Sequence, residues 1–563
     1  DGLPLALELA AAALGVLEPA ELLARMDRKL DLADAAGRTR PPRHRSLRAV
    51  IAWSHELLPP SARALFSALA VFPDGFDVEA AEAVRPGAGD ALADLEILVA
   101  ANLLRKSRAG TKGRLAFLES IRDFALELFE ARPDAPEIRR RHALHFLERA
   151  ERGSSALRGP CQTAALAALM PEEANFEAAL DFLAGRDGSD DALRLCAALE
   201  WYWYRSGQFA SGQRSLEKAL AAGRKAPGPL RGACLRALGW LRFTQGAWRE
   251  ARGFYLEALA LLEAGPASLD LVRCLADLGV AERWLGDRAS GDGRLRRAVE
   301  LARGLGDPGL LAMALVWDLG TTGGSPGDER QRLGLEEAVR LAREAEDPWI
   351  ESHAFEALGD LLRTRGDFRE AAPCYERALD GFDALGDSFL KAWTLEGLGM
   401  NAALSGRADE AEATLRDSLS LFVSIGSRSD AVFVLGELGV ARALAGDRRG
   451  ADLLLGAFGA LRRELGLETI AQTAWIASGA PPGAAGPTEA PDAKPSGQPR
   501  IDRHLAEAAA RSSDEWLRGS RIRYAELPEL VAPGNGPAGR PSRAERRGSD
   551  PSVAFRAAAA SRA

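Results

Sequence analysis

The sequence predicts a mainly α-helical protein whose central part is a solenoid of helical hairpins. Three observations predict this fold. A Leu-Gly pair recurs every 40 residues, or at twice that interval, from Leu238-Gly239 to Leu438-Gly439. A second glycine follows each pair, and small and large apolar side chains then recur at helical spacing. Self-similarity at a fixed period of this size is typical of repeat proteins, in which each unit is one supersecondary element.

The two glycines of each unit have different predicted roles. Gly239 lies inside a helical pattern, where glycine costs about 1 kcal/mol relative to alanine, so a close helix–helix contact is the expected compensation. Gly366, followed by Asp367, is placed to end the first helix and turn the chain. Ala371 and Tyr375 then share one helical face, which fits a second helix that packs against the first.

This pattern resembles tetratricopeptide repeats, although its helices are longer than those of the standard unit of about 34 residues. We count about seven units within residues 196–475, and the first lies at 201–207. The unit at Leu319-Gly320 is degraded by the glycine-rich stretch that follows it. The resemblance implies an array that binds a protein, a peptide or a small effector.

Composition and charge limit the class of protein. The 563 residues are 47% hydrophobic, which is enough for several domains. A formal net charge of -8 argues against a protein that coats nucleic acid. The five cysteines stand singly, and neither a secretory signal nor an apolar run of transmembrane length is visible. We therefore expect a cytoplasmic protein without a membrane anchor.

Residues 1–36 resemble the C-terminal edge of the nucleotide-binding domain of NB-ARC signalling ATPases, the STAND family. The match is Gly2-Leu3-Pro4, which fits the Gly-x-Pro motif of that family. It implies that this motif lies on the adenine side of ATP or ADP when the upstream domain is present. The sequence also starts inside an apolar helix at Asp1, so we expect it to be the C-terminal part of a longer protein.

The chain itself has no Gly-Lys dipeptide and therefore no P-loop. A P-loop needs its lysine and backbone amides to hold the phosphates. We expect neither a bound cofactor nor an enzymatic activity in this chain, whereas the full-length parent would bind ATP or ADP and could hydrolyse ATP.

Residues 37–130 predict a winged-helix domain that begins with a basic linker. Helices are followed by a small hairpin and one more helix, at Leu47–Leu58, Ser61–Val71, from Val78, Asp90–Ala101, Leu103–Ser107, Arg114–Leu118 and Ile121–Glu130. The stretches Trp53-Ser54, Leu65-Phe66, Gly75-Phe76 and Leu118–Arg122 resemble the winged helix of large bacterial regulators of the SARP and LuxR type. The resemblance implies a unit that packs on the nucleotide-binding domain and helps to hold the inactive state.

Direct DNA binding by this domain is an alternative that its charges oppose. A recognition helix needs basic or polar side chains toward phosphates and base edges. The helix before the predicted hairpin instead carries Asp90, Asp94 and Glu96 and no basic residue.

The remaining segments lead into the array or follow it. Residues 131–195 predict a helical adaptor, in which His142 and His145 share one side of a helix without a third metal ligand, so we expect no metal site. Beyond the array we expect a flexible linker at 476–500, capping helices at 501–530 and a disordered tail at 531–563.

The inner face of each first helix carries the candidate partner-binding residues. By analogy with tetratricopeptide repeats, this face includes the residue after the first glycine and the one three positions later. The candidates are Trp201, Tyr204, Trp240, Phe243, Arg283, Asp360 and Arg363. Aromatic side chains with arginine nearby are typical of peptide and ligand grooves. Burial against the adaptor helices is the alternative for the aromatic residues.

These features predict the sensor part of a STAND-type ATPase or transcriptional regulator. The resemblance implies that ADP holds such a protein closed until an effector on the repeats loosens the winged helix, permits ATP exchange and drives assembly into an oligomer. Two alternatives stay open: a stand-alone scaffold that binds proteins or peptides, and a regulator that binds DNA through the winged helix.

Overall fold

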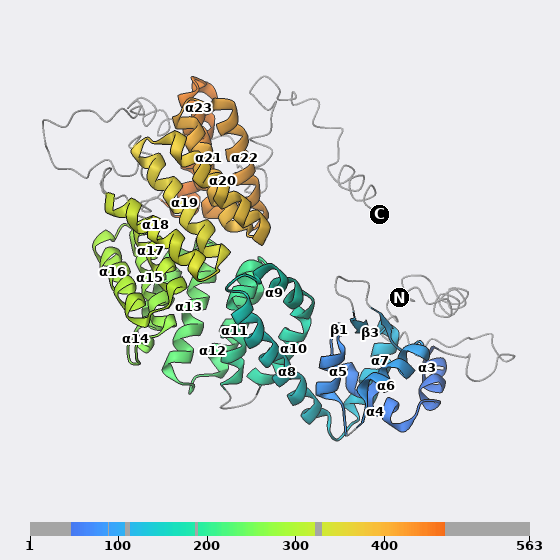
Figure 1. Ribbon diagram of the computed structural model, residues 1–563. Helices are drawn as coiled ribbons and strands as arrows, with labels where there is room; N and C mark the ends of the chain where they lie inside the picture. Colours follow the sequence, from blue (N-terminus) through green and yellow to red (C-terminus); the bar gives the residue numbers. More distant parts are fainter. Residues whose placement is uncertain (1–46, 88, 107–112, 186–189, 321–328, 468–563) are drawn as a thin grey trace, which may run out of the picture. The chain divides into compact units, whose positions relative to one another are not determined.

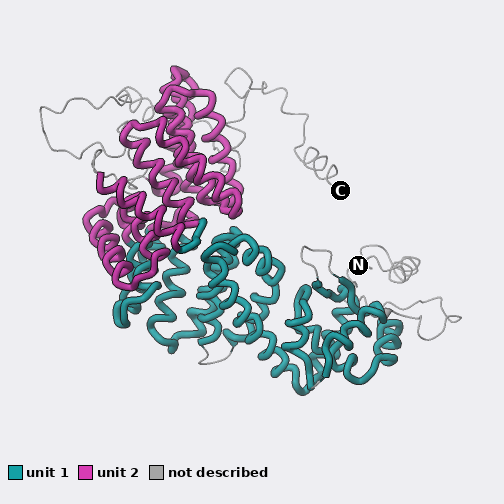
Figure 2. Tube along the Cα trace, viewed as in Figure 1, with its two compact units in different colours: residues 1–243, 249–278, 345–348 teal, residues 244–248, 279–344, 349–563 magenta. Residues whose placement is uncertain are grey.

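The computed structural model describes residues 47–87, 89–106, 113–185, 190–320 and 329–467. These parts of the chain are mainly helical, as predicted (Figure 1). They divide into two compact units: unit 1 contains residues 1–243, 249–278 and 345–348, and unit 2 contains 244–248, 279–344 and 349–563 (Figure 2). The predicted adenine-side residues Gly2, Leu3 and Pro4 lie outside the described residues, as do the predicted linker, capping helices and tail.

A small subdomain opens unit 1. Its helices are α3 (Leu47–Glu56), α4 (Pro60–Ala68), η3 (Leu69–Val71), α5 (Val78–Val84), α6 (Ala91–Ala100) and α7 (Glu119–Glu130). The strands β1 (Gly75–Phe76), β2 (Arg105–Lys106) and β3 (Leu115–Ala116) form an antiparallel sheet in the order β1-β3-β2. Gly75 and Arg105 both pair with Ala116. The sequence predicts the two hairpin strands but not β1, because a two-residue strand is too short to show alternation.

Aspartates begin two of these helices. The Asp77 carboxylate accepts from the Ala80 amide at 2.9 Å, and the Asp90 carboxylate accepts from the Leu92 amide at 2.9 Å. Each satisfies an amide that has no partner within its helix. Asp90, which we expected to be the first helical residue, is therefore the cap of α6.

Adaptor helices connect the small subdomain to the repeats. They are α8 (Ala135–Ala156), α9 (Gln162–Leu169), η4 (Met170–Glu172) and α10 (Glu173–Ala184). The first five repeat helices lie mostly in unit 1. They are α11 (Asp191–Arg205), α12 (Phe209–Ala222), α13 (Gly228–Thr244), α14 (Trp248–Leu262) and α15 (Leu269–Trp284).

Unit 2 continues the array with helices of similar length. They are α16 (Arg288–Leu305), α17 (Pro308–Gly320), α18 (Glu329–Glu344), α19 (Pro348–Arg365), α20 (Phe368–Leu385), α21 (Ser388–Leu404), α22 (Ala408–Ser424), α23 (Arg428–Leu444) and α24 (Arg448–Glu464). Among all the helices described, none combines the length and the apolar character needed to span a membrane.

The helix contact predicted from the repeat glycines is present. A Cβ atom on Gly239 would lie 2.6 Å from Cε1 of Tyr255, and one on Gly359 would lie 2.9 Å from Cε1 of Tyr375. Both tyrosines are fully buried. Only glycine admits such an approach, so the close contact explains why each inner helix tolerates this residue. Gly366, with a φ of 86°, turns the chain as predicted.

Candidate functional site

Four of the predicted partner-binding residues form one aromatic row on α11 and α13. Ring centroids are 5.5 Å apart for Trp201 and Tyr204, 5.5 Å for Tyr204 and Trp240, and 6.0 Å for Trp240 and Phe243. Trp201 is partly exposed and the other three are buried. The row therefore packs two inner helices together and offers mainly Trp201 to a partner.

The three charged candidates belong to unit 2 and are bound to neighbouring helices. Arg283 donates through Nε to Asp292 at 2.7 Å and through Nη1 to the Asp318 carbonyl at 2.8 Å. It thereby ties α15 to α16 and α17.

Arg363 and Asp360 surround the hydroxyl of the repeat tyrosine Tyr375. Arg363 donates to Asp360 and to the Tyr375 hydroxyl, each at 3.0 Å, and this hydroxyl donates to Asp360 at 2.7 Å. These contacts give all three charged candidates a structural role, and their role in partner binding stays a prediction.

A buried charge cluster in unit 1 was not predicted. It joins Glu200 of α11, Arg236 of α13, Arg273 and Asp277 of α15, and Arg158, which follows α8. Arg236 donates to the carboxylates of Glu200 and, at 3.1 Å, Asp277. Arg273 lies 4.0 Å from Glu200. The four residues on the repeat helices are at most 8% exposed.

The two carboxylates that bind Arg236 differ in the direction of their pKa shifts. Burial would raise the pKa of Glu200, but the guanidiniums of Arg236 and Arg273 outweigh it and lower that pKa. Burial raises the pKa of Asp277 to about 6 in spite of Arg236. Glu200 is therefore the better stabilised anion.

Trp201 connects the aromatic row to the arginines. The guanidinium carbon of Arg273 lies 5.6 Å from its ring centroid, and that of Arg158 lies 6.0 Å away. Both distances are within the range of cation–π attraction. The predicted aromatic residue thus stands beside two arginines.

Part of this cluster could have been found in the sequence. Arg236 lies two residues before the pair Leu238-Gly239, and Asp277 directly precedes Leu278-Gly279, so both are charged residues within an otherwise mainly apolar helix. Arg158 comes from the adaptor, and no spacing in the sequence relates it to the repeats.

Unit 2 carries carboxyl groups at corresponding places of its inner helices. Burial raises the pKa of Glu356, Glu396 and Glu437, and the last two hydrogen-bond each other. His353 lies 3.6 Å from Glu356 but gives it no positive charge, because burial lowers the pKa of this histidine to about 3. Burial therefore disfavours the charged form of these carboxyl groups.

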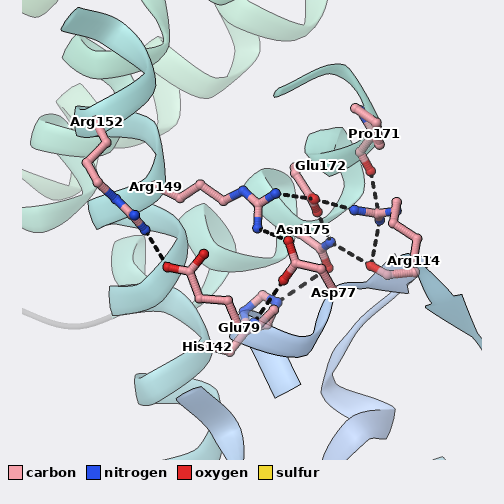
Figure 3. Close-up of polar contacts among 11 residues, drawn as sticks. Asp77, Glu79, Arg114, His142, Arg149, Arg152, Pro171, Glu172 and Asn175 are labelled. Carbon is pink, nitrogen blue, oxygen red and sulfur yellow. Dashed lines mark hydrogen bonds and ion pairs between the residues drawn. The ribbon is translucent and has the colours of Figure 1, made fainter. Parts of the chain in front are cut away.

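A second unpredicted feature is a polar junction between the small subdomain and the adaptor (Figure 3). At its centre the Glu172 carboxylate, with 1% of its side chain exposed, accepts from Arg114 and, at 2.7 Å, from Asn175, and it forms an ion pair with Arg149 at 3.1 Å. Arg114 also donates to the Gly75 carbonyl of β1 at 2.7 Å. One carboxylate thus holds residues from the sheet region, α8 and α10 together.

The rim of the junction adds further links. Arg149 donates to Asp77 at 2.6 Å, and Arg152 donates to Glu79 at 2.8 Å, so α8 is bound to the start of α5 (Figure 3). His142 lies within 3.5 Å of Asn175, and burial lowers its pKa to about 3, so it is neutral at physiological pH.

Aromatic side chains continue from this junction to the first repeat helix. Ring centroids are 6.2 Å apart for Phe72 and Phe146, 5.8 Å for Phe146 and Phe176, and 5.8 Å for Phe176 and Tyr202. Tyr202 lies on α11, the helix that carries Trp201. Packed side chains therefore connect the small subdomain to the inner face of the repeats.

Comparison with known proteins supports the repeat assignment. A sequence model of the tetratricopeptide repeat matches residues 200–264 and 350–424. Among solved structures, a Pyrococcus horikoshii STAND protein with a tetratricopeptide repeat sensor matches 94% of this chain and 74% of its own, with a TM-score of 0.50 and 14% identity. This likeness shows a shared fold.

Curated relatives come from mycobacteria. A Mycobacterium bovis protein named as an HTH-type transcriptional regulator is 27% identical over 403 residues, which are 69% of this chain and 41% of that protein. An uncharacterised protein of the same organism is 38% identical over 160 residues, or 26% of this chain and 38% of its own. The chain therefore spans about two fifths of the length of these relatives.

Proposed function

We propose that this tetratricopeptide-repeat protein is the sensing part of a STAND-type ATPase or transcriptional regulator. A protein, peptide or small effector binds the inner face of the repeats, and the small subdomain acts as a winged helix that couples binding to an upstream nucleotide-binding domain. ATP and ADP are ligands of that upstream domain and not of this chain. The polar junction around Glu172 is the observation that carries the proposal.

The junction is suited to couple movements of the adaptor and the small subdomain, because its buried ion pairs are costly to break. Its central carboxylate is buried and contacts Arg114, Arg149 and Asn175, which come from separate segments. Removing one partner of a buried ion pair costs about 3–5 kcal/mol, since a charge is left uncompensated. A displacement of α10 that keeps these bonds must therefore carry β1 and α5 with it.

The exposed surface of the small subdomain favours a protein partner over DNA. Helix α6, which precedes the hairpin, exposes Leu92, Ala93 and Glu96. The Leu92 side chain is exposed to 49%, and its helix has no basic residue. An apolar and acidic face does not fit a phosphate backbone, whereas it supports packing against another domain.

Hydrogen exchange of the chain tests the coupling. Glu172→Gln should lower amide protection in both β1 and α10 at least tenfold, because Arg114 and Arg149 lose their buried counter-charge. The matched control is Glu79→Gln, whose ion pair with Arg152 is more than half exposed and should contribute little. Protection that falls in only one of the two segments, or equally in both variants, would contradict the proposed coupling.

The coding sequence upstream of Asp1 tests the nucleotide part of the proposal. A Gly-x-x-x-x-Gly-Lys-Ser/Thr motif in that sequence is expected. A start codon directly before Asp1 would contradict the proposal and favour the stand-alone scaffold. In the longer protein, Trp201→Ala should impair the response to the partner while the fold survives, because Trp201 is partly exposed; a normal response would reject this part of the inner face as the binding surface.

A further inference from the structure

The arginine cluster of unit 1 contains buried donors without a hydrogen-bond acceptor. Among the described residues, none accepts from Nε of Arg158, Nε of Arg236 or Nη1 of Arg273. Arg273 is 5% exposed, and the Glu200 oxygen 4.0 Å from its Nη1 already accepts from Arg236. A buried donor without an acceptor costs about 1–3 kcal/mol, and more when it is charged, so this arrangement points to a function.

The hydrogen-bonded counter-charge of the cluster is concentrated on Arg236. Arg158, Arg236 and Arg273 face two carboxylates, Glu200 and Asp277, and both carboxylates are bonded to Arg236. Asp270 acts on all three arginines, and Asp347 on Arg158, through the longer-range field. Burial, and then Arg158 and Arg236, lower the pKa of Arg273 to about 9. The charged form of Arg273 is therefore less well compensated than that of Arg236, whose pKa its acids raise.

One edge of the cluster can be reached from solvent. Arg158 and Trp201 are both partly exposed, whereas the other arginines and acids are buried. The Arg158 guanidinium lies 6.0 Å from the Trp201 ring. A ligand that approaches this edge therefore meets a guanidinium and an indole ring together, with Tyr204 and Trp240 continuing the aromatic row behind them.

We infer that this edge binds a carboxylate carried next to an aromatic ring, as in a small aromatic acid or the C-terminal residue of a peptide. The carboxylate would pair with the partly exposed guanidinium of Arg158, and the ring would lie against Trp201. This inference rests on the proposed function, because it names the ligand class of the same repeat face.

Charge balance favours a carboxylate over a phosphate group. A monovalent carboxylate accepts two parallel N–H bonds from one guanidinium. A phosphate dianion carries more charge and would be repelled more strongly by Glu200 and Asp277.

The experiment measures binding of two matched pairs of probes to the purified chain by titration calorimetry. One pair is phenylacetate and phenylacetamide, and the other is acetyl-Gly-Phe and its C-terminal amide. Each acid that binds should bind at least tenfold more tightly than its amide. Binding of phenylacetate alone identifies a small-molecule site, and binding of acetyl-Gly-Phe alone identifies a peptide terminus; either result supports the inference.

Two variants assign the binding to this edge. Arg158→Gln should weaken the binding of the acid at least tenfold, and the fold should survive because Arg158 is partly exposed. The matched control is Arg194→Gln, which removes a surface ion pair between Glu151 and the same helix α11, and should leave binding unchanged.

Three results would overturn the inference: equal binding of acids and amides, no binding of either acid at about 10 mM, or unchanged binding by Arg158→Gln. No nucleotide and no second domain is needed in this experiment. If an acid binds but the hydrogen exchange of Glu172→Gln shows no coupling, the binding site is supported and the proposed sensor function is rejected. If the coupling is present but neither acid binds, only the binding site is rejected.

Discussion

The inner faces of the two units share one backbone pattern but bury different ionisable side chains. In unit 1, α13 and α15 present Arg236 and Arg273 close to the Leu-Gly pairs. In unit 2, α19, α21 and α23 present Glu356, Glu396 and Glu437 at similar places. Unit 1 therefore places arginines at this face, and unit 2 places carboxyl groups whose charged form burial disfavours.

The two units have the same glycine contacts between helices but differ in the ionisable residues beside them. The helix contact needs glycine opposite a large side chain, as for Gly239 with Tyr255 and Gly359 with Tyr375. The residues one turn earlier do not take part in this contact, so their charge is free to differ between units. Differences in ligand preference are therefore expected at these positions and not at the glycines.

The largest expected effect is the loss of the arginine that holds the acids of unit 1. Arg236→Met leaves Glu200 and Asp277 buried without their main counter-ion and should destabilise unit 1 by about 3–5 kcal/mol. Arg242→Met, on the same helix but in a partly exposed pair with Glu217, should cost about 0–1 kcal/mol. Chemical denaturation followed by hydrogen exchange measures both; similar losses would show that the cluster is not held by Arg236.

A smaller loss of stability, similar in both units, is expected when a larger side chain replaces a glycine at the helix contacts. Gly239→Leu and Gly359→Leu should each destabilise the array by about 1–3 kcal/mol, because the added side chain meets a buried tyrosine. Gly253→Ala, at a helical glycine with no atom within 4 Å of an added Cβ, should instead stabilise by up to about 1 kcal/mol. A loss in only one unit would contradict the shared geometry.

The smallest expected effect is a dependence of the stability of unit 2 on pH. Burial raises the pKa of Glu437, and it raises that of Asp430 to about 7. Because the folded protein then binds more protons than the unfolded chain, unit 2 should lose stability as the pH rises from about 4.5 towards these values. Burial lowers the pKa of His353 to about 3, which acts in the opposite direction below about pH 6.5.

Replacing one carboxyl group isolates its contribution to this dependence. Glu437→Gln should match the wild type near pH 4.5 and be more stable at pH 8, because the amide is never charged. Glu410→Gln, at an exposed pair with Arg407, is the control and should remove little of the slope. Thermal unfolding across this pH range provides the measurement, and an unchanged slope for Glu437→Gln would contradict the role of the buried carboxyl groups.

The repeat array was predictable because its signal is local and recurs. The mainly helical fold class and the tetratricopeptide assignment are confirmed by the structure and by the matched repeats. The aromatic row was partly predictable, since Trp201 with Tyr204, and Trp240 with Phe243, lie three residues apart on their helices. Burial of three of these rings was left open as an alternative, because sequence spacing does not show what covers a helix face.

The sequence alone determined the period, the helical hairpins and the glycine contacts, because each depends on residues less than one repeat apart. Only the tertiary structure decided which charges meet. Arg158 reaches Trp201 from the adaptor, and Glu172 gathers Arg114, Arg149 and Asn175 from separate elements. Such contacts depend on how helices pack in three dimensions, and a buried charge gives no periodic signal that could reveal its partner in advance.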